Sequence, residues 1–187
     1  MSQNKILIDT NTYFRLAQSV HPLLKSNFGN PPKQLCITKD LEGEFKSNPR
    51  LQGKFGWFWL DEYIKNRNAP LQLGKAQKKQ FDNDRLTFIG IANDMGLTNI
   101  SLEDIHAATY ASILEISLVT DDGDLTTLCS ELGVSVICTL DLLKVMLECN
   151  HIKIEQIRAI AGYWIHMADC PKDFKSDYKR IIGENPP

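Results

Sequence analysis

A run of branched apolar residues near the start of the chain limits its fold most strongly. Ile6, Leu7 and Ile8 follow one another without a polar residue between them, and Asp9 comes directly after them. Such a run is typical of a strand that is buried on both faces, as in a parallel sheet covered by helices on both sides. We therefore expect a strand with Asp9 at its carboxyl end, followed by a helix that residues 10–12 can cap.

The rest of the chain alternates between expected strands and expected helices. Short apolar runs predict further strands at 34–38, 116–120 and 134–138, and residues 21–32 are expected to form a loop. Helical spacing and capping residues predict helices at about 12–19, 39–45, 57–65, 75–95, 101–115, 125–132, 139–148, 154–168 and 174–182. The alternation predicts an α/β fold with a mainly parallel sheet between two layers of helices.

Length and composition are those of about one domain with additions. The chain has 187 residues and a formal net charge of -2, so it lacks the strong positive charge of a general nucleic-acid coat. Its five cysteines are odd in number and lack Cys-x-x-Cys spacing, so we expect buried reduced thiols and a cytoplasmic protein. We expect no signal segment and no membrane contact, because no apolar stretch approaches membrane-spanning length.

A second group of carboxylates follows the strand expected at 116–120. Asp121, Asp122 and Asp124 lie in the turn directly after this run, as Asp9 does after the first run. Ligands of open α/β sheets bind outside the carboxyl ends of the strands, so both groups are expected to face one place. Crowded carboxylates repel one another, and all-oxygen ligands suit Mg²⁺ or Mn²⁺. The alternative is that these aspartates only cap the helices that follow them.

The order and spacing of these acids resemble the PIN-domain nucleases, a family that includes the VapC-type toxins. Asp9, Thr10 and Asn11 resemble the family's Asp-Thr-Asn motif after the first strand. The family's second acid lies on the helix after the second strand, where Glu44 fits the pattern and Glu42 fits it less well.

The other two acids of this resemblance lie later in the chain. Asp104 begins the segment DIHAATYA, which is similar to the family's Asp-x-x-x-Ala-Ala helix start. Residues 101–104 also resemble a capping box, which is the structural alternative for Asp104. Thr120, Asp122 and Asp124 resemble the family's Thr-x-Asp-x-Asp turn.

The resemblance covers about residues 5–146 and implies a PIN-like three-layer α/β/α domain at 1–148. A helical and aromatic insert is placed at about 46–96, and a C-terminal helical extension at 149–187 is expected to pack on the same domain. The implied activity is that of an endoribonuclease, a hydrolase that cleaves single-stranded RNA with Mg²⁺ or Mn²⁺. If the chain is a toxin, the resemblance implies an antitoxin partner and a homodimer.

The resemblance also assigns roles to particular residues. Catalytic and metal-binding roles fall on four carboxylates, which are Asp9, Glu44, Asp104 and Asp122. Asp124 is implied as a further, supporting group at the metal. Contacts that orient these carboxylates or touch a phosphate are implied for Thr10, Asn11 and Thr120.

Substrate contacts are less defined by the sequence. Basic side chains that can steer a phosphate backbone are Lys46, Arg50, Lys54, Lys65, Arg67, Lys75, Lys78, Lys79 and Arg85, with an ordinary solvated face as the alternative. Trp57 and Trp59 can stack on bases, but so dense an aromatic patch favours packing in the core or against a partner. His106 lies two residues after Asp104, so we expect a structural or exposed role.

Two other functions compete with the nuclease. A phosphatase of the haloacid-dehalogenase type also begins with an aspartate after the first strand, but it requires a second aspartate where Asn11 stands. A PIN-like module that only binds other proteins is the stronger alternative.

Overall fold

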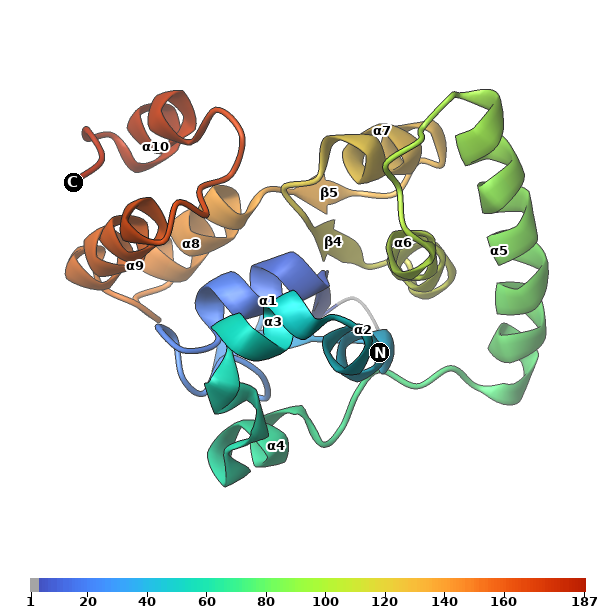
Figure 1. Cartoon of the computed structure of the whole chain (residues 1–187), viewed down its shortest axis with the longest axis horizontal. Helices are drawn as coiled ribbons and strands as arrows, with labels where there is room; N and C mark the ends of the chain where they lie inside the picture. The colour runs from blue at the N-terminus through green and yellow to red at the C-terminus, as the bar shows by residue number, and fades with distance from the viewer. Residues whose placement is uncertain (1–3) are drawn as a thin grey trace.

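Five strands form a single sheet in the computed structural model, which describes residues 4–187 (Figure 1). They are β1 (Lys5–Ile8), β2 (Asn27–Phe28), β3 (Lys33–Cys36), β4 (Ser117–Val119) and β5 (Val136–Ile137). Their order across the sheet is β2-β3-β1-β4-β5, and every neighbouring pair is parallel except β2 with β3. The predicted α/β class with a mainly parallel sheet is confirmed.

Helices cover both faces of this sheet. The elements packed on the first face are α1 (Thr10–Leu16), α2 (Asp40–Ser47), α8 (Thr139–Glu148), α9 (Ile154–His166) and α10 (Phe174–Ile182). Those on the second face are α5 (Lys75–Asp94), α6 (Leu102–Leu114) and α7 (Gly123–Glu131). Figure 1 shows α8 to α10 and α5 to α7 on opposite sides of the sheet, which gives three layers.

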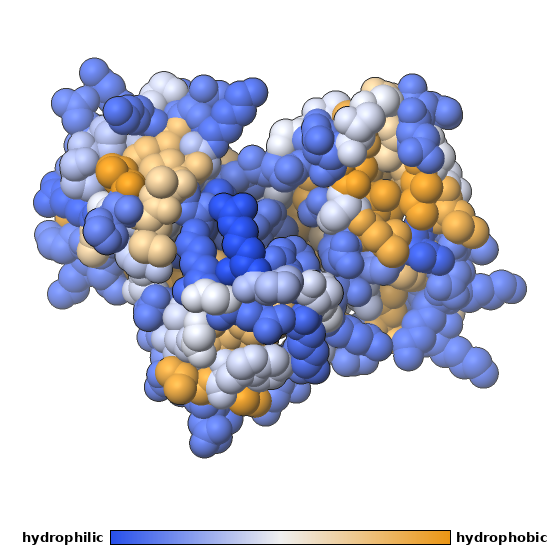
Figure 2. Space-filling view, in the orientation of Figure 1, coloured by the Kyte–Doolittle hydropathy of each residue, from blue (hydrophilic) through white to orange (hydrophobic). Residues whose placement is uncertain are grey.

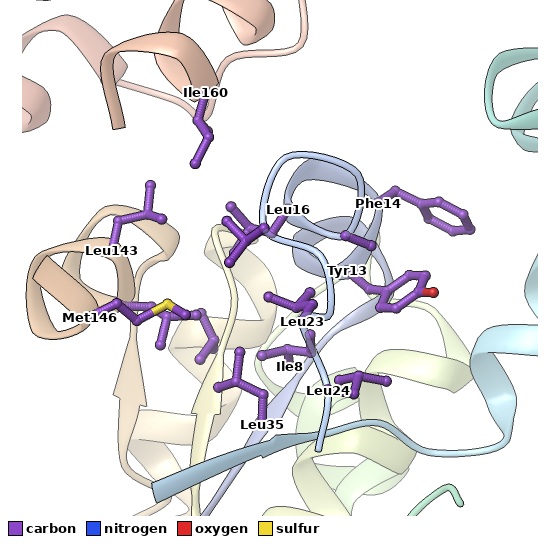
Figure 3. Packing of buried hydrophobic residues seen from close by; sticks show 14 of the residues in the cluster. Ile8, Tyr13, Phe14, Leu16, Leu23, Leu24, Leu35, Leu143, Met146 and Ile160 are labelled. Atoms are coloured by element: carbon purple, nitrogen blue, oxygen red, sulfur yellow. The ribbon is translucent and has the colours of Figure 1, made fainter. Parts of the chain in front are cut away.

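After the exposed Lys5 at its start, the central strand β1 is apolar because its next three side chains alternate between two cores. Ile6 and Ile8 belong to the core under α1, α8 and α9, whereas Leu7 belongs to the core under α6 and α7. Figure 3 shows Leu143 and Ile160 pointing toward the side chains of α1 within the first core. A polar residue at any of the three strand positions would therefore be buried in one core or the other.

The insert between α2 and α5 differs from the prediction. The single helix expected at 57–65 is replaced by α3 (Pro49–Lys54), the 3-10 helix η1 (Gly56–Trp59) and α4 (Asp61–Arg67). α3 forms because Oδ1 of Asn48 accepts hydrogen bonds from the N–H groups of Arg50 and Leu51, and Pro49 fits the first helical turn.

Most of the aromatic patch in this insert packs into the first core. The Phe45 and Phe58 rings stack with their centroids 3.9 Å apart, and Phe14 stacks on Phe55 at 4.6 Å. Trp59 is the exception, with 45% of its surface exposed. Trp57 is partly buried against the same core, so the expectation of core packing is confirmed for Trp57 but not for Trp59. The stacked phenylalanines fix α2 against α1.

Two boundaries near the N-terminus also differ from expectation. α1 begins at Thr10, two residues earlier than expected and with Asp9 as its N-cap, because the Asp9 carboxylate accepts a hydrogen bond from the Thr12 N–H. The segment expected to be a loop contains β2, which pairs antiparallel with β3. α5, α6, α9 and α10 lie within two residues of their predicted bounds.

The C-terminal helices pack into the first core beside α1. Trp164 on α9 is 1% exposed, and its indole N–H donates a hydrogen bond to the Arg15 carbonyl oxygen (3.2 Å). All five cysteines are free thiols. Within residues 4–187, no helix combines the length and the apolar character needed to cross a membrane.

Candidate acidic site

The carboxyl ends of β1 and β4 lie side by side at one edge of the sheet. The Asp9 N–H donates a hydrogen bond to the Val119 carbonyl oxygen (3.1 Å), which continues the parallel pairing one residue beyond β1. From β1 the chain crosses to β3 on one side and then to β4 on the other. Asp9 and Thr120 therefore flank the point where the direction of winding reverses, which is where open α/β sheets bind ligands.

Asp9 is the most buried carboxylate of this edge, with 6% of its surface exposed. Its Oδ1 accepts the Thr12 N–H at 2.6 Å. Burial raises the pKa of Asp9 to about 6, although hydrogen bonds from Thr120 and Thr12 lower it, and the nearby charge of Asp121 raises it further. A cation bound beside Asp9 would stabilise the ionised form of this buried carboxylate.

Asp104 lies across a small cavity from Asp9. The two side chains, together with Thr10, line a cavity of about 20 Å³, which is about the space that one water molecule needs. Ser101 and Asp104 form a capping box, in which Oδ2 of Asp104 accepts the Ser101 hydroxyl (2.7 Å) and N–H (2.9 Å). Burial raises the pKa of Asp104, the hydrogen bonds from Ser101 lower it, and repulsion by Asp122 raises it. The capping alternative is therefore correct, and the same carboxylate also lines the cavity.

Glu44 approaches this cavity from α2. Burial raises the pKa of Glu44, a hydrogen bond from Thr10 lowers it, and repulsion by Asp104 raises it. The α2 helix holds Glu44 in this position because Leu41 and Phe45, on the adjoining face, are buried in the first core. Thr10 thus orients one acid of the site, as expected for a short polar neighbour.

Asp122 reaches the same edge from the N-terminus of α7. Its Oδ1 accepts the Leu125 N–H (2.8 Å), and its own N–H donates to the Thr120 hydroxyl oxygen (3.0 Å). Thr120 is 1% exposed and also hydrogen-bonds to the Asp9 carboxylate. One buried hydroxyl therefore connects two of the predicted acids.

The structure thus brings four of the predicted residues, Asp9, Glu44, Asp104 and Asp122, to one edge of the sheet. No family model, no curated protein and no solved structure matches the chain. Within residues 4–187, no group of three or more His, Cys, Asp or Glu side chains is arranged to hold a metal ion.

Other predicted residues lie outside the cavity. Asp124 accepts a hydrogen bond from the Asn99 N–H (3.2 Å) and so ties α7 to the loop before α6. Asn11 is exposed and lines a separate pocket that also contains Glu44. Asp121, expected at a variable position, accepts the Thr139 N–H (2.9 Å) and hydroxyl (2.6 Å), which joins β4 to α8.

Two further acids line the cavity and were missed in the sequence. Asp40 and Glu103 stand on its rim, and Nδ1 of His106 lies 3.3 Å from Oδ1 of Asp40. Burial raises the pKa of Asp40, but hydrogen bonding and the charge of His106 outweigh it and leave the pKa lowered. Asp40 begins α2 after three residues that follow β3, so it too lies in a connection from a strand to a helix, although less directly than Asp9 does. His106, expected to be structural or exposed, is half-buried beside this acid.

The donor set agrees in type with a hard divalent cation. The polar part of the cavity lining consists of four carboxylates and two threonine hydroxyls, beside four apolar side chains, and Glu44 and Asp122 lie outside this lining. Hydrogen bonds to helix N-termini engage Oδ1 of Asp9, Oδ1 of Asp122 and Oδ2 of Asp104. These hydrogen bonds leave the second oxygens of Asp104 and Asp122 without a capping role, although the carboxylates as they stand are not grouped closely enough to hold a metal ion within residues 4–187.

Proposed function

We propose that the chain is a PIN-like nuclease that hydrolyses phosphodiester bonds of single-stranded RNA with Mg²⁺ or Mn²⁺. The observation that carries the proposal is the convergence of Asp9, Glu44, Asp104 and Asp122 at the point where the winding of the sheet reverses. These acids come from four distant segments, and their mutual repulsion works against the fold unless a cation offsets it.

The residues would divide the chemistry as follows. Asp9, Asp104 and Asp122 would hold the cation, while Thr120 and Thr10 keep the carboxylates in orientation through their hydrogen bonds. A divalent cation at such a site lowers the pKa of water and polarises the phosphodiester.

Glu44 suits a different role at the edge of the site. Its pKa is raised by burial and by Asp104, and its helix places it at the border of the neighbouring pocket. A carboxylate whose pKa is raised is a stronger base than an ordinary one, so Glu44 would position the attacking water and take its proton.

The test is cleavage of labelled single-stranded RNA and DNA with Mn²⁺ or with a chelator. We expect RNA cleavage by the unaltered chain with Mn²⁺, none with chelator, and loss of at least about a hundredfold in Asp9→Asn, because the substitution removes a charged ligand but keeps the shape and helix cap. Asp177→Asn, which removes an aspartate of α10, is the matched control and should retain full activity. Equal cleavage by Asp9→Asn and the unaltered chain would remove the assignment.

A non-catalytic interaction module is the second candidate, favoured by a patch of exposed apolar side chains on the insert. Trp59, Leu60 and Ile64 are between 40% and 52% exposed, and such patches often mark protein contacts. If the chain is a toxin, this candidate surface and the acidic site are where an antitoxin or a second copy would bind, in the cytoplasm. Binding of Mn²⁺ without any cleavage of RNA or DNA would favour this reading.

A further inference from the structure

A second pocket adjoins the acidic site, and its lining carries one more positive than negative side chain. It encloses about 220 Å³ between α1, α3 and the loop before α10. Arg15, Arg50 and Lys54 bring three positive charges to its wall, against two carboxylates, Glu44 and Asp169. Glu44 also belongs to the acidic site, so the two sites share a wall. Figure 2 shows a hollow on this side of the molecule, between the C-terminal helices and the lower part of the view, lined by strongly hydrophilic side chains.

The Asp169 carboxylate forms ion pairs with two of the three cations of this pocket. Oδ2 of Asp169 lies 2.6 Å from Nζ of Lys54, and its Oδ1 lies 3.4 Å from a guanidinium nitrogen of Arg15. The other terminal nitrogen of Arg15 is 2.7 Å from Asp121, and this ion pair holds the Arg15 side chain in place. Arg50 forms no ion pair within residues 4–187. Two cations thus hold one carboxylate, and a third remains free.

The carboxylate is brought to the pocket by the C-terminal extension. Asp169 lies in the loop between α9 and α10, and its N–H donates to the Trp164 carbonyl oxygen (2.9 Å). The Trp164 indole in turn donates to the Arg15 carbonyl oxygen (3.2 Å). The base of the loop is therefore anchored on α1, while the Asp169 side chain remains a third exposed.

Two amides complete a lining suited to an oxyanion. Asn11 and Asn48 stand in the wall, and Asn11 directly follows the residues that orient the acidic site. Guanidinium, ammonium and amide N–H groups together are the donors that bind phosphate. A carboxylate offers two of the oxygens that a phosphate offers, so Asp169 stands where a phosphate would bind.

We propose that this pocket binds a backbone phosphate of the nucleic-acid strand, and that the phosphate displaces the Asp169 carboxylate from Lys54 and Arg15. The identity of the strand rests on the proposed nuclease function, whereas the binding of phosphate itself does not. Because Glu44 lines both sites, the bound phosphate would lie next to the one that is cleaved. Asp169 keeps the cations ordered and partly neutralised when no substrate is present.

The pocket is tested by calorimetric titration of the metal-free protein with inorganic phosphate. Asp169→Asn should bind phosphate on the order of tenfold more tightly, because it removes the competing negative charge. Lys54→Gln and Arg50→Gln should bind it on the order of fivefold more weakly. Glu184→Gln is the matched control: it also removes a carboxylate paired with an arginine, Arg158, but away from this pocket, and it should leave the affinity unchanged.

The outcomes separate this pocket from the acidic site. Arg50→Gln removes no ion pair, so this variant should fold normally. Its phosphate affinity therefore tests the pocket even if Asp169→Asn unfolds. Equal phosphate affinity in Arg50→Gln, Lys54→Gln and the unaltered chain would overturn the phosphate pocket. Single-stranded RNA should compete with phosphate on Asp9→Asn protein, which cannot cleave it, and RNA that fails to compete would also overturn the proposal. Loss of cleavage alone, with phosphate binding intact, would count only against the nuclease.

Discussion

Replacing Asp9 by asparagine should stabilise the fold at neutral and alkaline pH. Burial raises the pKa of Asp9 from 3.8 to about 6, and this difference corresponds to about 3 kcal/mol for the ionised form. Because the folded pKa lies above the unfolded one, the stabilising effect of protonation is fully present below pH 3.8 and is lost as the pH rises through 6. Asparagine carries no charge and is an equally good N-cap, so the Thr12 N–H keeps its acceptor.

The expected gain for Asp9→Asn is about 2–3 kcal/mol at pH 8 and close to zero at pH 3.5. In a chain of this length the upper value raises the Tm by about 6–12 °C. The assay is thermal and urea unfolding followed by circular dichroism at both pH values, with chelator present. Asp177→Asn is the control, because its carboxylate lies in an ion pair with a largely exposed arginine and should change stability by less than about 1 kcal/mol.

Two results would refute this reasoning. Equal stability of Asp9→Asn and the unaltered chain at pH 8 would mean that the carboxylate carries no burial penalty. A gain of the same size at both pH values would mean that it comes from the shape of the side chain and not from its charge.

Three further predictions follow from the packing and the charges. Mn²⁺ at about 100 times its Kd should stabilise the unaltered chain by about 2.7 kcal/mol but not Asp122→Asn, as measured by thermal unfolding; an equal response would count against the site. Asp121→Ala should cost about 3 kcal/mol, because it leaves Arg15 without its closest partner in a half-buried position; a loss below 1 kcal/mol in urea unfolding would contradict this. Trp164→Ala should cost about 3–5 kcal/mol by the same measurement, and a smaller loss would mean that α9 packs on α1 only loosely.

Local patterns determined the parts of the fold that could be predicted. β1 was recognisable because Ile6, Leu7 and Ile8 satisfy two cores at once, and a short helix was expected at 174–182, after the break at Pro171, where the structure has α10. α3 was missed because Gly53 weakens its helical pattern, whereas the structure stabilises it through the Asn48 cap. A single capping side chain thus outweighed helix propensity.

Long-range charge pairs could not be predicted in this way. The Arg15–Asp121 and Arg15–Asp169 pairs join residues 106 and 154 positions apart, and no local pattern marks either partner. Asp40 is a different case, because its position after a strand segment was visible but it matched no position of the resembled motif. Asp9 and Asp122 were predicted because they follow strands and Asp104 because it lies at a helix start, whereas Glu44, in the middle of α2, was predicted only from the resembled family pattern.

Capping a helix does not prevent these aspartates from taking the proposed role at a cation. The carboxyl edge of a parallel sheet is where the next helices begin, so an aspartate there caps a helix with one oxygen and can direct the other into the crevice. Asp122 caps α7 with Oδ1, and Asp104, which also lines the small cavity, belongs to the capping box of α6. Asparagine at either position keeps an acceptor for the cap but removes the charge. Asp122→Asn should accordingly be as stable as the unaltered chain in chelator, but Mn²⁺ should not stabilise it. If Asp122 were purely structural, Mn²⁺ would stabilise neither the unaltered chain nor Asp122→Asn.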